Sequence, residues 1–342
     1  MLFFFSHLVT SGHLKNNIDF YFGKLPKVLK KKSITVLNNE TELTNYRVIK
    51  NNKTKRELIV LSNYIGIFNE IRILKSLISQ TIKIIFKKKQ FEKIKGDTFY
   101  KNFILNIISQ NTIKNIRLHF QIKKILQLYE PKKILYTFEG HCYEKIILDT
   151  TKLYNKDIEC IAYQHSIIFP IQPSLLSPLN TKFEPEKILT SGFKGKNILK
   201  KCYKKSKIFH IGNPRHKKKK INFNTKKNIC LLIPDGTLNE TKKMINLIPV
   251  ENKKINSKIK YLVRFHPGVS DFFRKNTNPN IKFSNNKLSH DLDNCRWAVY
   301  RGTGAVVHCL AQGIRPIYYS YNKREISIDP LNDINTFKKK IY

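Results

Sequence analysis

Short apolar runs alternate with helical patterns along the chain from residue 132 onward. Compact apolar runs are typical of buried strands, and apolar residues three or four positions apart are typical of helices. The expected strands are 132–138, 158–163, 188–190, 207–211, 228–233, 260–265, 298–300 and 316–319. The expected helices are 143–154, 240–247, 305–312 and one that follows Gly192. This alternation predicts parallel α/β sheets.

The pattern is less regular over the first hundred residues. The apolar opening Met1–Phe5 predicts a buried strand, because Ser6 and His7 interrupt it long before the roughly 20 residues of a membrane span. Beyond it, the pattern predicts a strand at 57–61 and helices at 69–86 and 103–128, the last ending before Pro131. No other stretch is apolar over a spanning length, so we expect any membrane contact to be peripheral.

The alternation of strands and helices restarts after Ser206. We therefore expect an α/β protein with two Rossmann-like doubly wound domains, residues 1–206 and 207–342, that face each other across a cleft. Of the 342 residues, 41% are hydrophobic and 11% aromatic, which is enough to bury a core in each domain. A wholly disordered chain is thereby excluded.

The chain is strongly basic, with 64 Lys and Arg against 24 Asp and Glu and a net charge of +40. Such a charge favours nucleic acid, an anionic membrane face or phosphorylated substrates. An AT-rich genome also explains many of the Lys, Asn and Ile residues. The lysine runs 30–32, 87–89 and 217–220 are then solvated faces.

Neither the cysteines nor the acidic residues predict a metal site. The six cysteines form no C-x-x-C pair and no zinc-type spacing with histidine, which fits a reducing cytosol. No Asp-x-Asp pair follows an expected strand, so we expect no bound divalent ion.

Three polar turns follow expected strands in the second half of the chain. They are Asp235-Gly236-Thr237, Arg264-Phe265-His266-Pro267 and Arg301-Gly302-Thr303-Gly304. The free amides at a helix start attract phosphate, and an imidazole or hydroxyl adds a hydrogen-bond donor. Taken alone, the Asp235 turn is more often a capped turn that binds nothing, and His266 is equally compatible with a surface histidine in a turn. Three such turns at successive strand ends favour a phosphate-binding edge.

Two turns in the first half contain candidates for proton transfer. Glu139 and His141 follow the strand 132–138, and His165 follows the strand 158–163. A carboxylate or imidazole at such a position can accept a proton from a hydroxyl, and Glu144 is spaced to orient His141. A capping or packing role is the alternative for each residue.

Residues 132–330 resemble bacterial surface-polysaccharide glycosyltransferases of the GT-B fold. The resemblance lies in residues 185–192, in Ile211-Gly212-Asn213-Pro214-Arg215, and in 289–317 with Leu292, Thr303, Gly313 and Pro316. Phe138-Glu139-Gly140, His266-Pro267 and Thr303 are similar to motifs of bacterial sialyltransferases and capsular Kdo transferases. That similarity implies Glu139 as the base and a CMP phosphate bound by His266 and Thr303.

The sequence departs from these families at three positions. His308 stands where many GT-B enzymes have a glutamate that holds the donor ribose. Phe138 replaces a first carboxylate, and Gly304 follows Thr303 where a second hydroxyl is usual. These departures leave the donor nucleotide open.

The resemblance implies a metal-independent, inverting glycosyltransferase of lipopolysaccharide or capsule biosynthesis. Residues 1–206 would form the acceptor side and 207–342 the side that binds the nucleotide-sugar, which is a co-substrate, with no cofactor. The implied donor-binding residues are Asp235, Gly236, Thr237, Arg264, His266, Pro267, Arg301, Gly302, Thr303, Gly304 and His308, and the implied catalytic residues are Glu139, His141 and His165. The acceptor would be a glycan or lipid-linked glycan.

The implied location is the cytoplasm, with peripheral contact at the anionic inner membrane. Two other functions remain open: a CDP-glycerol-type polyol-phosphate transferase and a non-catalytic basic polyanion-binding protein. Specific nucleic-acid binding is not expected, since the lysines are spread over the whole chain and form no known motif.

Overall fold

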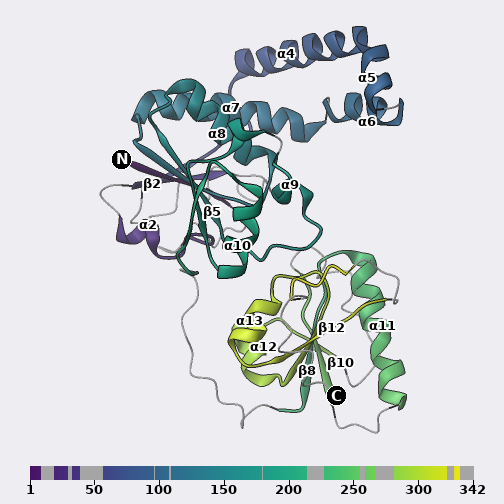
Figure 1. The fold of residues 1–342 in the computed structure, drawn as a ribbon. Coiled ribbons are helices and arrows are strands. Elements are labelled where there is room, and N and C mark those ends of the chain that lie inside the picture. The colour runs from purple at the N-terminus through teal and green to yellow at the C-terminus, as the bar shows by residue number, and fades with distance from the viewer. Residues whose placement is uncertain are drawn as a thin grey trace. The chain divides into compact units, whose positions relative to one another are not determined.

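The computed structural model divides into two compact units. It describes residues 1–8, 19–29, 33–38, 57–95, 97–107, 109–178, 180–213, 227–254, 259–266, 281–321 and 327–331. The first unit comprises Met1–His165 and Pro173–His216, and the second comprises Ser166–Gln172 and Lys217–Tyr342. Figure 1 shows that each unit contains its own sheet flanked by helices.

The first unit is built on a seven-stranded sheet with the order β3-β2-β1-β4-β5-β6-β7. Its strands are β1 (Leu2–His7), β2 (Ser33–Asn38), β3 (Leu58–Val60), β4 (Lys133–Thr137), β5 (Glu159–Gln164), β6 (Lys187–Thr190) and β7 (Lys207–His210). All neighbouring strands in it are parallel. The strands β2 and β3 are added in turn on one side of β1, and the strands from β4 to β7 are added in turn on its other side. This is a Rossmann-like strand order.

The apolar start of the chain forms the centre of this sheet. β1 pairs with β2 on one side and with β4 on the other, and Phe3, Phe4 and Phe5 are buried. The ring of Phe4 lies 5.2 Å from that of Phe22, in a cluster that includes Leu135. The prediction of a buried first strand is confirmed.

Helices and one short 3-10 turn connect the strands of the first unit. They are α2 (Leu25–Val28), α4 (Ile67–Phe86), α5 (Lys88–Lys95), α6 (Asp97–Ile107), α7 (Gln110–Tyr129), α8 (Cys142–Tyr154), α9 (Pro173–Leu176), η2 (Thr181–Phe183) and α10 (Phe193–Cys202). The single helix expected over 103–128 is wrong. Ser109 starts a new helix, because its side chain accepts a hydrogen bond from the Thr112 amide and caps α7.

The second unit contains a five-stranded parallel sheet with the order β10-β9-β8-β11-β12. Its strands are β8 (Ile229–Ile233), β9 (Lys260–Val263), β10 (Ile281–Phe283), β11 (Trp297–Tyr300) and β12 (Arg315–Tyr318), and its helices are α11 (Leu238–Lys254), α12 (Leu288–Asn294) and α13 (Val306–Ala311). This order repeats the central part of the first sheet.

Alternate residues of β8 build two cores. Leu231 packs with Leu292 and Cys309 from α12 and α13, while Leu232 packs in another cluster with Ile248 from α11. Successive side chains of a strand point to opposite faces, so helices cover both faces of this sheet.

The structure differs from the expected organisation at β7. This strand was expected to open the second domain, yet it pairs with β6 at the edge of the first sheet. An apolar run predicts a strand but does not say which sheet it joins. β10 and α12 were not expected, because β10 is only three residues long and α12 seven.

We expect Leu231→Ala to lower the free energy of unfolding of the second unit by about 2–5 kcal/mol, because it leaves a cavity at a fully buried position of the sheet. Urea unfolding followed by circular dichroism measures this loss. Leu238→Ala, at a site that is 37% exposed, is the control and should cost about 0.5 kcal/mol or less. Equal losses in the two variants would contradict the assigned core.

Candidate functional site

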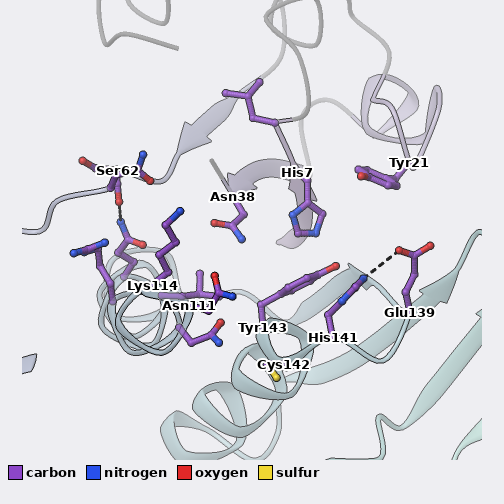
Figure 2. A pocket seen from close by; sticks show the side chains of 16 residues that line it. His7, Tyr21, Asn38, Ser62, Asn111, Lys114, Glu139, His141, Cys142 and Tyr143 are labelled. Carbon is purple, nitrogen blue, oxygen red and sulfur yellow. Dashed lines mark hydrogen bonds and ion pairs between the residues drawn. The ribbon is translucent and has the colours of Figure 1, made fainter. Parts of the chain in front are cut away.

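The carboxyl edge of the first sheet borders a cavity of about 560 Å³. It lies at the topological switch point of the sheet, between β1 and β4, where the strand order reverses. Ligands bind at this point in open α/β sheets. Strand ends supply His7, Asn38 and Glu139 to its wall. Figure 2 shows Asn38 and His7 facing Lys114 and Asn111 of α7, and Glu139 directed toward His141.

The structure brings together the three residues predicted to be catalytic. One carboxylate oxygen of Glu139 lies 3.4 Å from Nε2 of His141, and the other lies 3.2 Å from Nε2 of His165. The His141 side chain is 55% exposed and the His165 side chain 6%. Glu139 and His141 line the cavity, and His165 is buried. A carboxylate between two imidazoles can fix their orientation and stabilise a proton on either.

His7 is a fourth polar residue at this edge, which the sequence did not single out. Its Nε2 lies 3.2 Å from the hydroxyl of Thr137, and its ring lies 4.5 Å from that of Tyr143. Burial, and to a smaller extent the nearby His141, lowers the pKa of His7 from 6.5 to about 4. His7 is therefore neutral at pH 7. Its position as the last residue of the first strand was the available signal.

The backbone of the Glu139–His141 turn is held by a buried carboxylate. Glu144 accepts hydrogen bonds from the amides of Glu139, Gly140 and His141, at 2.7, 2.8 and 2.9 Å. Burial raises the pKa of Glu144 to about 8, while the amide of Glu139 acts in the opposite direction. Glu144 was expected to orient the His141 side chain; in the structure its carboxyl oxygens accept hydrogen bonds from the backbone amides of the turn.

Gly140 is required by this turn. Its φ is +87°, and an added Cβ atom would lie 2.6 Å from the backbone of Ser174 in α9. A side chain here would meet both left-handed strain and a rigid backbone neighbour. The turn that presents Glu139 and His141 is thus fixed from both sides.

The second unit brings together residues from its three predicted turns. An added Cβ on Gly236 would lie 2.6 Å from Cγ of His266, so the imidazole covers this glycine. An added Cβ on Gly302 would lie 3.4 Å from Cβ of Asp235. These turns follow the neighbouring strands β8, β9 and β11, so the expected convergence at one sheet edge is confirmed for these four residues.

The two arginines expected to bind the donor form ion pairs within the unit. Arg301 is buried, and its Nε lies 3.0 Å from Glu240 of α11. Arg264 donates to buried Asp291 at 2.8 Å. Both side chains therefore stabilise the edge of the sheet. Their contact with a donor stays a prediction.

The remaining predicted donor residues occupy the turns and α13. Asp235 accepts hydrogen bonds from the amide and hydroxyl of Thr237, at 2.8 and 3.1 Å. Thr303 accepts from the Ala305 amide. Gly304 is exposed and His308 half-buried.

Pro267 lies outside the described residues.

Comparison with known proteins concerns the fold. No family model and no curated protein sequence matches the chain. A putative UDP-N-acetylglucosamine 2-epimerase from Listeria monocytogenes is similar in structure, with a TM-score of 0.55 and 10% identity over 99% of this chain and 86% of that one. The UDP-GlcNAc 2-epimerase from Neisseria meningitidis bound to UDP-GlcNAc also gives 0.55 and 10%, over 99% and 91%.

A glycosyltransferase of kitacinnamycin is similar as well, with a TM-score of 0.50 and 10% identity over 94% of this chain and 80% of that one. The chain has the GT-B fold. At this level of identity the likeness establishes the two Rossmann-like sheets and leaves the reaction to be argued from the residues.

We expect the stability of the protein to fall as pH decreases from 6.5 to about 4, in part because His7 stays neutral in the fold and gains a proton on unfolding. This contribution is complete above pH 6.5 and is lost toward pH 4. Its size is about 3 kcal/mol. Urea unfolding of His7→Gln over this range should show a shallower acid dependence. An NMR titration in which His7 has a pKa near 6.5 would contradict the assignment.

We also expect Glu144→Gln to lower the free energy of unfolding by about 1–3 kcal/mol, because the amide group of glutamine turns a donor toward a backbone N–H. Thermal or urea unfolding measures the loss. Glu184→Gln, whose carboxylate accepts from the Lys205 amide at the surface, is the control and should change stability much less. The expectation fails if both variants unfold alike.

Proposed function

We propose that the protein is a metal-independent, inverting glycosyltransferase that moves a sugar from a nucleotide donor to a cell-surface glycan precursor. The observation that supports this most directly is Glu139, placed 3.4 and 3.2 Å from two imidazoles at the cavity of the first unit. Inverting transfer needs a base at the acceptor hydroxyl. The GT-B fold is compatible with such chemistry.

In the proposed reaction, the acceptor hydroxyl loses its proton to the Glu139–His141 pair. The oxygen then attacks the anomeric carbon, and the bond to the nucleotide phosphate breaks. His141 is the more exposed member of the pair, and the carboxylate behind it stabilises the protonated imidazole. His165 holds the second oxygen of Glu139. The proposal thus assigns the proton to a pair rather than to Glu139 alone.

The donor side of the proposal lies at the carboxyl edge of the second sheet. His266 covers Gly236 there, close to the start of the 17-residue helix α11. An imidazole near the start of a helix suits a phosphate, while the carboxylate of Asp235 suits a hydroxyl of the nucleoside. Hydrogen-bond donors at this edge would stabilise the charge that develops on the leaving phosphate without a metal ion.

The donor nucleotide has two supported candidates. The motifs around Glu139, His266 and Thr303 resemble those of CMP-dependent transferases, whereas a similar structure contains UDP-GlcNAc. Similarity to epimerases also makes epimerisation of UDP-GlcNAc a reaction that the same assay must detect. Lipopolysaccharide or capsule as the product pathway belongs to this proposal.

We expect a nucleotide that occupies the second unit to raise the melting temperature of the protein, because a ligand that binds only the folded state stabilises it. A panel of CMP, CDP, UDP and GDP and their sugar conjugates identifies the donor by differential scanning fluorimetry. His266→Ala should abolish the shift, and Glu139→Gln should keep it while losing transfer to an acceptor.

His290→Ala, at an exposed position of α12, is the matched control and should retain both nucleotide stabilisation and transfer. A product carrying the polyol phosphate of CDP-glycerol would identify the alternative transferase. Conversion of UDP-GlcNAc without an acceptor would identify an epimerase. Full transfer by both Glu139→Gln and His266→Ala would refute the proposed site.

A further inference from the structure

The helix α4 exposes a continuous apolar face. Its residues follow the helical spacing of three or four positions, and all of them are exposed: Ile67, Ile71, Leu74, Ile78, Ile82 and Ile85. We call these six residues the α4 stripe. Phe68 and Phe86, near its two ends, are 80% and 86% exposed. An apolar face of this length is uncommon on the surface of a monomer.

The other side of the same helix anchors it to the protein. Ile73 and Leu77 are buried, and Glu70 forms a two-pronged ion pair with Arg117 of α7 at 2.8 Å. Figure 1 shows α4 running along the outer side of the helices α6 and α7, away from the first sheet. The α4 stripe is therefore a fixed feature of the fold and stays uncovered within the described part of the chain.

Basic side chains border the α4 stripe. Lys75 is exposed next to the stripe around the helix axis, and Arg72 and Lys83 are exposed further round the same helix. Lys87, Lys89 and Lys93 follow and are exposed too. The acidic residue of α4, Glu70, is bound to Arg117. Apart from the paired Glu70, the charged residues of α4 are therefore all basic and exposed.

We propose that the α4 stripe docks on the surface of an anionic lipid bilayer. Apolar side chains would enter the boundary between headgroups and acyl chains, and the exposed Lys and Arg of the same helix would extend to the lipid phosphates. None of the helices in the described residues is long and apolar enough to cross a membrane. The helix lies in the plane of the interface, as an amphipathic helix with a basic border does.

The charge of this face argues against a second copy of the chain as its partner. A symmetric pairing of two α4 stripes would place the basic residues of one copy beside those of the other. Like charges at such an interface oppose association, whereas the same residues attract anionic lipid. Charge complementarity therefore favours the membrane.

The helix that carries the stripe begins close to the cavity of the candidate site. Ser62 and Asn63 line the cavity just before α4 begins, and α7, which packs on α4, supplies Lys114 to its wall. If the proposed function holds, a bilayer on α4 lies close to a cavity that would take a lipid-linked acceptor. The docking itself does not depend on that function.

We expect the full chain to sediment with vesicles of phosphatidylglycerol and phosphatidylcholine but weakly with phosphatidylcholine alone, and we expect binding to decrease as salt rises. Leu74→Glu combined with Ile78→Glu should weaken binding about tenfold or more. Lys75→Glu combined with Lys83→Glu should remove the preference for the anionic vesicles.

The matched control is Leu153→Glu, at a 75% exposed apolar position of α8, which should bind vesicles like the unchanged protein. Circular dichroism melting of each variant checks the fold. Equal binding by the α4 double variants and the control would overturn the proposal, as would a lipid-free dimer that Leu74→Glu and Ile78→Glu convert to a monomer. Nucleotide-dependent stabilisation, measured on the same variants without lipid, separates failure of docking from failure of the proposed function.

Discussion

The parallel direction of neighbouring strands is the constraint on which the rest of the structure depends. In each sheet the chain first builds outward from a central strand, β1 or β8, and then returns to add β4 or β11 on its other side. Every strand therefore ends at the same edge, and the connecting helices leave in opposite directions at the point of reversal. Residues distant in sequence, such as His7 and Glu139, meet there because of strand order.

A second constraint determines how the turn after β4 presents its side chains. Glu144 binds three successive backbone amides, and α9 lies so close to Gly140 that no Cβ atom fits. The backbone of the turn is therefore held by hydrogen bonds to Glu144 and by close contact with α9. A carboxylate and imidazoles in such a rigid setting keep their mutual geometry without a substrate, which lowers the cost of ordering them for proton transfer.

Much of the fold followed from local patterns, because a buried strand in a parallel sheet is a compact apolar run bounded by turn residues. The strands around Ile134 and Leu231 were predictable for this reason, as was the placement of Glu139, His141 and His165 at strand ends. Sheet membership depends on long-range pairing, so β7 was assigned to the other domain. The break at Ser109 was missed because a single capping residue interrupts an otherwise continuous helical pattern.

The candidate site was predictable only in part, since sequence position shows where a side chain starts and not what it contacts. Arg301 and Arg264 follow strands as phosphate-binding residues would, yet they are paired with Glu240 and Asp291. Those partners lie 61 and 27 residues away, beyond any local pattern. His7 was overlooked for the opposite reason, because it ends an apolar strand whose neighbours are all core residues.

The charge of the protein likewise has to be interpreted from the surroundings of the charged residues and not from the sequence alone. A net charge of +40 spread over the chain has no single explanation. On α4 the basic residues instead border a row of exposed apolar side chains, whose contact with water is unfavourable. Composition bias accounts for the abundance of lysine and isoleucine, but not for the spacing that gathers six exposed apolar residues on one face of a helix. Basic residues and an exposed apolar face occur together on α4, a helix held in place by the ion pair between Glu70 and Arg117. This combination is the reason to expect an anionic lipid surface as the partner of this part of the protein.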